Sequence, residues 1–86
     1  MNTFYGIVGT RVKCLKEYDG NKAVIGKLGT IVRADASVTG IQFDENVNGH
    51  SCGGRCTHGY GWEFYTSNVH DFVEIVKQNE FEVDLI

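Results

Sequence analysis

Residues 29–44 read GTIVRADASVTGIQFD and contain two short segments with the features of β-strands. The first segment, residues 29–34, is rich in β-branched residues, which pack well on the pleated surface of a sheet. In the second, residues 39–44, apolar and polar residues alternate and place Ile41 and Phe43 on one face. We therefore predict two strands here, as parts of an all-β fold.

Three further segments have the same character. Residues 11–15 alternate between polar and apolar, and residues 62–66 place Trp62 and Phe64 on one face. Residues 72–76 are mostly apolar and mostly β-branched. A Ser or Asn cap at residues 67–68 predicts a single helical or 3₁₀ turn just before the last strand. Five short strands separated by glycine-containing turns predict a small all-β barrel or sandwich.

The length of 86 residues predicts one domain. We place the β-barrel in residues 1–76 and treat residues 77–86 as an acidic tail or an added edge strand. A chain of this size has a thin core, and small domains often gain stability from a disulfide or a metal. The first residues lack the features of a signal peptide, and no run approaches the ~20 apolar residues of a membrane-spanning helix. We expect a cytoplasmic protein with reduced thiols.

Charge is distributed unevenly along the chain. Residues 1–34 carry six basic and two acidic residues, whereas residues 35–86 carry two basic and nine acidic ones, which gives a net charge of −3. This balance argues against broad binding to a phosphate backbone. The acidic half suits a protein with a basic groove, because complementary potentials steer encounter. In the tail we predict partner contacts at Glu80, Glu82 and Asp84.

Residues 49–62, GHSCGGRCTHGYGW, concentrate the chemistry of the chain. His50, Cys52, Cys56 and His58 offer four nitrogen and sulfur donors of the kind that Zn²⁺ prefers, and the glycines between them permit a tight loop. We predict a structural zinc site formed by these four residues. The Cys-x-x-x-Cys spacing differs from the usual zinc-ribbon spacing, so the fourth ligand stays open among His58, His70, Cys14 and a carboxylate (Asp44 or Glu63).

Two other interpretations of this loop compete with zinc. It could be a glycine-rich loop with free thiols or a Cys52–Cys56 disulfide. It could also be catalytic, with one of these cysteines as nucleophile and His50 or His58 as base. The sequence offers no orienting acid and no oxyanion donors, so we predict no catalytic residues and no enzyme activity.

The remaining candidates have structural explanations. Cys14 fits a small buried hydrophobe, and His70 fits a residue that caps or packs beside the short helical turn. We assign Ile41, Phe43, Trp62 and Phe64 to the core. The predicted surface aromatics are Tyr5, Tyr18, Tyr60 and Tyr65.

The chain resembles small bacterial and bacteriophage proteins with an SH3-like barrel. The resemblance covers roughly residues 9–76 and rests on Gly-Thr-Ile-Val (29–32), Phe-Asp (43–44), and a Gly-His-x-Cys-x-Gly-x-Cys stretch (49–56) that is followed by Gly-Trp (61–62). The relatives often have a histidine where this chain has Tyr60. The resemblance implies a five-stranded SH3-like barrel with a long metal-binding loop between strands three and four. In SH3-like folds the polar loop after the first strand flanks the usual peptide groove, so the resemblance also implies that Tyr18 contacts the partner. Some phage proteins of this size and acidity are anti-CRISPR proteins or other inhibitors of host defence.

These features together predict a zinc-stabilised binding protein. Its most specific form is a phage-derived inhibitor whose acidic face docks on a host nucleic-acid enzyme, such as a CRISPR effector nuclease. The alternative is a nucleic-acid-binding accessory module that uses the basic residues of the first third: Arg11, Lys13, Lys16, Lys27 and Arg33.

Overall fold

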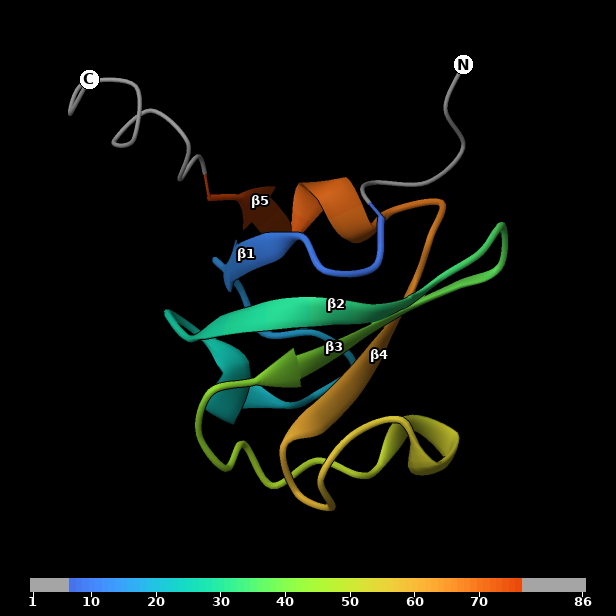
Figure 1. Ribbon diagram of the computed structural model, residues 1–86. Helices are drawn as coiled ribbons and strands as arrows, with labels where there is room; N and C mark the ends of the chain where they lie inside the picture. Colours follow the sequence, from blue (N-terminus) through green and yellow to red (C-terminus); the bar gives the residue numbers. More distant parts are fainter. Residues whose placement is uncertain (1–6, 77–86) are drawn as a thin grey trace, which may run out of the picture.

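The computed structural model describes residues 7–76, which form an all-β fold around one five-stranded antiparallel sheet (Figure 1). The strands are β1 (Arg11–Cys14), β2 (Leu28–Ala34), β3 (Val38–Phe43), β4 (Gly61–Tyr65) and β5 (Val73–Ile75). Their order in the sheet is β4-β3-β2-β1-β5. Helical structure in residues 7–76 is limited to the 3₁₀ turns η1 (Lys22–Val24), η2 (Cys52–Gly54) and η3 (Val69–Asp71).

This arrangement confirms the all-β class, the five strands and the helical turn before the last strand. The sheet is not closed, because β4 and β5 are its two edges. In Figure 1, β5 and the yellow loop around η2 lie at opposite sides of the sheet. The predicted tail at residues 77–86, with its partner contacts at Glu80, Glu82 and Asp84, lies outside the described residues, as does Tyr5. None of the helices in residues 7–76 has the length and apolar character needed to cross a membrane.

The β2–β3 hairpin is organised by one carboxylate at its turn. Asp35 Oδ1 accepts hydrogen bonds from the backbone N–H groups of Ser37 (2.9 Å) and Val38 (2.7 Å). Its Oδ2 lies 2.7 Å from Arg33 Nε. A short polar side chain that binds backbone N–H groups two and three residues on is typical of such turns. These bonds to the charged form lower the pKa of Asp35 to about 2, with the Val38 N–H as the main cause.

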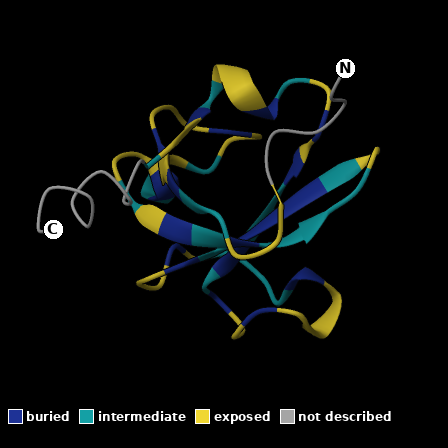
Figure 2. Ribbon diagram, turned by 45° about the horizontal axis from the view of Figure 1, so that its top comes forward, coloured by how far each residue is buried: buried dark blue, intermediate teal, exposed yellow. Residues whose placement is uncertain are grey.

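The core lies on one face of the sheet, and buried residues follow the strands while exposed ones gather in the loops (Figure 2). Ile41, Phe43 and Phe64 are buried, which confirms their assignment to the core. Cys14 is fully buried, as predicted, and its thiol donates to the Lys16 carbonyl. The other large side chains that are fully or almost fully buried are Val12, Val24, Ile31, Val47, Val69 and Val73. Trp62 is only partly buried against this cluster.

Tyr18 is not a surface aromatic, so that prediction is wrong. Only 9% of the residue is exposed, and its ring centroid lies 4.5 Å from that of Phe64 and 4.7 Å from that of Phe72. Its hydroxyl accepts a hydrogen bond from Tyr65 N (3.0 Å) and lies 3.1 Å from Asn68 Oδ1. The loop after β1 folds back over the sheet, so that the ring completes the core while the hydroxyl satisfies polar groups around β4. By contrast, Tyr65 is 67% exposed, as predicted.

Two buried hydroxyls connect the hairpin turn to the end of β4. Thr39 is fully buried and Thr66 is 3% exposed, and their oxygens lie 2.9 Å apart. Thr66 Oγ1 also donates to the Asp35 carbonyl at 2.7 Å. Each buried hydroxyl therefore has a partner, as buried polar groups require.

Candidate functional site

The loop between β3 and β4 is attached at its base to the first residue of β4. His50 and Gly61 exchange both backbone hydrogen bonds, at 2.8 and 2.9 Å. Gly59 accepts from the N–H groups of Val47 (2.9 Å) and Gly49 (3.0 Å). The chain then turns through η2, where residues 52–54 all have positive φ. Two of these three residues are glycines, for which this conformation carries no steric penalty.

The structure brings the two thiols of the loop together. Cys52 is 1% exposed and Cys56 is 8% exposed. A Cβ atom added at Gly61 would lie 2.7 Å from each sulfur, so both thiols occupy the space above this glycine. Burial raises the pKa of both thiols, and the neighbouring Cys56 raises that of Cys52 further. Since the thiolate is the nucleophile, this environment disfavours nucleophilic chemistry.

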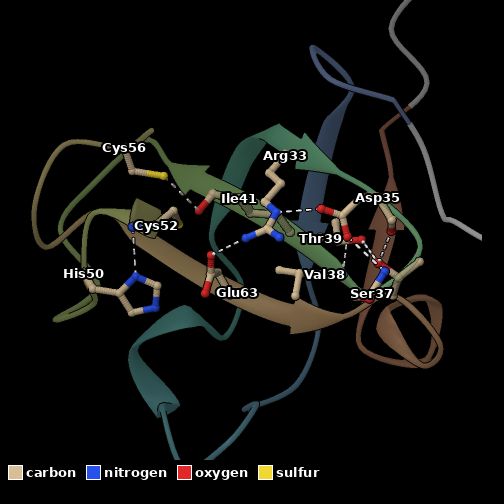
Figure 3. A network of polar contacts seen from close by, with 11 residues as sticks. Arg33, Asp35, Ser37, Val38, Thr39, Ile41, His50, Cys52, Cys56 and Glu63 are labelled. Carbon is tan, nitrogen blue, oxygen red and sulfur yellow. Dashed lines mark hydrogen bonds and ion pairs between the residues drawn. The ribbon is translucent and has the colours of Figure 1, made fainter. Parts of the chain in front are cut away.

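The two histidines of the loop do not join the thiols. His50 Nδ1 accepts a hydrogen bond from Cys52 N at 3.0 Å (Figure 3). The His50 ring packs against Trp62, with 5.2 Å between the ring centroids. His58 is exposed at the turn before β4. Nowhere in residues 7–76 do three or more His, Cys, Asp or Glu side chains lie where they could hold one metal ion. The donor set as it stands is two thiols, and four-ligand coordination would require both imidazoles to move. The zinc site therefore stays a prediction.

The alternative fourth ligands lie in other contacts. Cys14 is in the core, and His70 is exposed in η3 beside Asp71. Asp44 forms a bidentate pair with Arg11 at 2.6 and 2.8 Å. Glu63 lies on the sheet next to the loop, with its Oε2 3.5 Å from Arg33 Nη1 (Figure 3).

A second feature, the β4 hollow, lies beside β4 and is a candidate binding site. It has a volume of about 360 Å³ and is lined by residues 62–65 of β4, by Tyr18 and Asp19 of the loop after β1, and by His50 and Val38. Trp62 Nε1 donates to the Tyr18 carbonyl at 3.0 Å, which fixes the indole against that loop. The hollow thus joins residues that are more than forty positions apart in the sequence.

The β4 hollow combines aromatic side chains with carboxylates. Trp62 is half-buried and Tyr65 is exposed, so both offer accessible ring surface. Glu63 is partly neutralised by Arg33, whereas Asp19 is exposed and forms no ion pair within residues 7–76. Aromatic faces beside carboxylates attract a cationic group. Two of the predicted site residues line this hollow: Tyr18, predicted as a partner contact, and His50, predicted as a zinc ligand.

The hollow does not follow from the sequence when Trp62 is assigned wholly to the core, because Trp62 is only partly buried there. The signal that could have found it is the run Trp62-Glu63-Phe64-Tyr65, in which aromatic residues occur on both faces of one strand. A core on one side of a sheet uses the aromatic residues of one face only, so an aromatic residue on the opposite face needs a different explanation. The contribution of Asp19 could not be read from the sequence, because it depends on where the β1–β2 loop folds.

No known protein family, curated protein or solved structure matches this chain. The interpretation of the site therefore rests on its geometry and chemistry.

Proposed function

We propose that this chain is a small protein-recognition domain that binds a basic segment of a partner protein in the β4 hollow. The observation that carries the proposal is the combination of accessible aromatic rings with the carboxylates of Asp19 and Glu63 in one open concavity. Such a site attracts an arginine or lysine side chain through its charge and through the aromatic faces, each cation–π contact contributing about 0.5–2 kcal/mol. The net charge of −3 supports a basic partner.

Binding without turnover is the mode of action in this proposal. The two loop cysteines are buried, and burial raises the pKa of each thiol, so neither is an activated nucleophile. His50 Nδ1 accepts from the backbone of Cys52, so this nitrogen is not free to take a proton from a thiol. A partner-binding role makes no demand on these groups.

The finer predictions from the sequence belong to the same proposal. Strand β1 lies between β2 and β5, and the single turn η3 precedes β5, which supports an SH3-like layout. A host nucleic-acid enzyme, such as a CRISPR effector nuclease, would present the basic groove that the acidic chain fits. A structural Zn²⁺ in the loop would be held first by Cys52 and Cys56, the two donors that already lie together.

The nucleic-acid-binding alternative is less well supported. Three of the five basic residues invoked for it are engaged by carboxylates: Arg11 by Asp44 at 2.6 Å, Lys27 by Glu45 at 3.3 Å, and Arg33 by Asp35 at 2.7 Å. A phosphate backbone would have to compete with these partners. The local charge that remains for nucleic acid is correspondingly small.

An NMR titration tests the proposed function. The probe is the capped pentapeptide Ac-Thr-Val-Arg-Val-Thr-NH₂, and its control replaces arginine with citrulline, a neutral residue of nearly the same shape. We expect amide shifts at residues 18–19 and 62–65 with the arginine peptide and much smaller ones with citrulline. Asp19→Asn should weaken binding several-fold, whereas Asp71→Asn, an exposed carboxylate in η3, should not. Shifts elsewhere, or none at millimolar peptide, would overturn the proposal.

A further inference from the structure

The backbone of β4 has an outer side, away from β3, and the hydrogen bonds identify which residues point there. Gly61 exchanges both of its backbone bonds with His50, away from β3. Because backbone directions alternate along an antiparallel strand, Glu63 and Tyr65 also point outward. The even-numbered neighbours point the other way: the Tyr60 carbonyl accepts from Phe43 and the Thr66 N–H donates to Ser37.

Of these three outward positions, the middle one is unpaired. Gly61 is paired with His50, and Tyr65 is engaged on both sides, by the Tyr18 hydroxyl at its N–H (3.0 Å) and by Asn68 N at its carbonyl (3.1 Å). Neither the N–H nor the C=O of Glu63 has a hydrogen-bond partner within residues 7–76. Among residues 7–76 the outer edge of β4 therefore offers one unpaired donor and one unpaired acceptor, and they belong to a residue that lines the hollow.

We propose that the partner segment binds as an added β-strand that pairs with the backbone of Glu63 and places a basic side chain in the β4 hollow. This inference rests on the proposed function and specifies how the ligand lies. The hollow reaches both sides of the strand edge, since it is lined by Trp62 and Phe64 from one face and by Glu63 and Tyr65 from the other. An extended chain beside the unpaired backbone of Glu63 suits such a space, because its backbone supplies hydrogen bonds and its alternate side chains supply specificity.

The residue opposite Glu63 is the one that carries the positive charge. Directly opposite residues in a strand pair project onto the same face, a few ångström apart at Cβ. A basic side chain at that position lies beside the Glu63 carboxylate and the exposed ring of Tyr65. The neighbouring residues of the ligand project onto the other face, towards Trp62, where apolar side chains fit.

Charge also argues against the occupants that this chain could supply itself. Residues 77–86 carry three acids and one lysine and follow β5, the strand at the opposite edge of the sheet. A second copy that paired β4 with β4 would bring two Glu63 carboxylates close together, and like charges facing each other destabilise a strand pair. A basic partner segment satisfies the same edge without this repulsion.

Backbone N-methylation of the peptide separates strand pairing from side-chain recognition. In one variant of Ac-Thr-Val-Arg-Val-Thr-NH₂ the arginine N–H is methylated, which removes the donor to the Glu63 carbonyl and leaves every side chain unchanged. In the matched control the valine after arginine is methylated, where the N–H points away from β4. We expect the first change to weaken binding about tenfold or more and the second by less than about threefold. Bound peptide should also slow hydrogen exchange at the Glu63 amide.

Each outcome decides a separate statement. If both methylated peptides bind as well as the parent, strand addition is wrong while the basic-ligand site stands. If methylation at valine is the harmful change, the arginine does not lie opposite Glu63. If the parent peptide leaves residues 18–19 and 62–65 unperturbed, the proposed function itself fails. Concentration-dependent slowing of the Glu63 amide without peptide would show that a second copy occupies the edge instead.

Discussion

The sheet and the loop over residues 47–61 are stabilised in different ways. The sheet buries large apolar side chains such as Ile31, Phe43 and Phe64, so its stability comes from contacts between side chains. The loop has little apolar content and is held by backbone bonds to β4 and by two thiols that fit above Gly61. The stability of the sheet should therefore fall most when buried side-chain atoms are removed. The stability of the loop should fall most when atoms are added at its close contacts.

Removing a core ring should produce the largest effect. Phe43 is fully buried in β3, and we expect Phe43→Ala to lower the free energy of unfolding by about 3–5 kcal/mol. Urea denaturation measures this loss. Tyr65→Ala removes a ring that is 67% exposed on the neighbouring strand and should cost far less. Similar losses for both variants would contradict a core confined to one face of the sheet.

Zinc, if it binds the loop as the sequence predicts, adds the next largest contribution. At free zinc a hundredfold above its dissociation constant, binding would add about 2.7 kcal/mol to the stability. We expect one zinc per chain in protein purified without added metal, its loss in Cys52→Ser, and a lower melting temperature after chelation. Asp71→Asn, a change outside the loop at a residue that is not a candidate ligand, should keep the metal. Metal-free protein whose melting temperature does not respond to chelators would rule out the zinc site.

Adding one methyl group at Gly61, against which both loop thiols pack, should have a moderate effect on stability. In Gly61→Ala the new Cβ would lie 2.7 Å from the sulfurs of Cys52 and Cys56 and from the His50 carbonyl oxygen. We expect a loss of about 1–3 kcal/mol, with amide shift changes concentrated in residues 50–61. Combining it with Cys52→Ala and Cys56→Ala should reduce the penalty, because part of the overlap disappears. An unchanged loop in the single variant would show that the thiols do not rest on this glycine.

The smallest effect concerns pH and lies in the hairpin turn of the sheet. The folded-state pKa of Asp35 is lowered to about 2, below its ordinary value. At pH values between the folded and the unfolded pKa, the native state therefore binds fewer protons than the unfolded state. Its stabilising contribution is complete above about pH 4 and is lost as the pH falls towards 2. Urea denaturation from pH 5 to 2 should show a shallower decline for Asp35→Asn than for the native chain. Ser37→Ala keeps the turn N–H groups and should follow the native curve; parallel curves for all three would refute this role.

The strands could be predicted from sequence because each depends on its own alternation. Residues 29–34 and 39–44 became β2 and β3 within one residue at either end, since β-branched and alternating residues specify a strand locally. The position of Tyr18 could not be predicted in this way. Its burial depends on Phe64 and Phe72, which lie about fifty positions further along the chain. The loop shows the same limit, because the donors that sequence spacing grouped as four are separated when His50 packs on Trp62.

The direction of the hydrogen bond between the two buried threonines, Thr39 and Thr66, is fixed. A hydroxyl carries a single hydrogen, and that of Thr66 is given to the Asp35 carbonyl, so the hydrogen between the two threonines must come from Thr39. Both hydrogen bonds are thus donated in the same direction, from Thr39 in β3 to Thr66 and from Thr66 to the carbonyl at the start of the turn. Thr39→Val would leave Thr66 able to donate to the Asp35 carbonyl. Thr66→Val would leave both the Thr39 hydroxyl and the Asp35 carbonyl without their partner in the interior. The two Thr→Val substitutions make the same change of shape. Their costs in folding stability would then differ through the direction of these two hydrogen bonds.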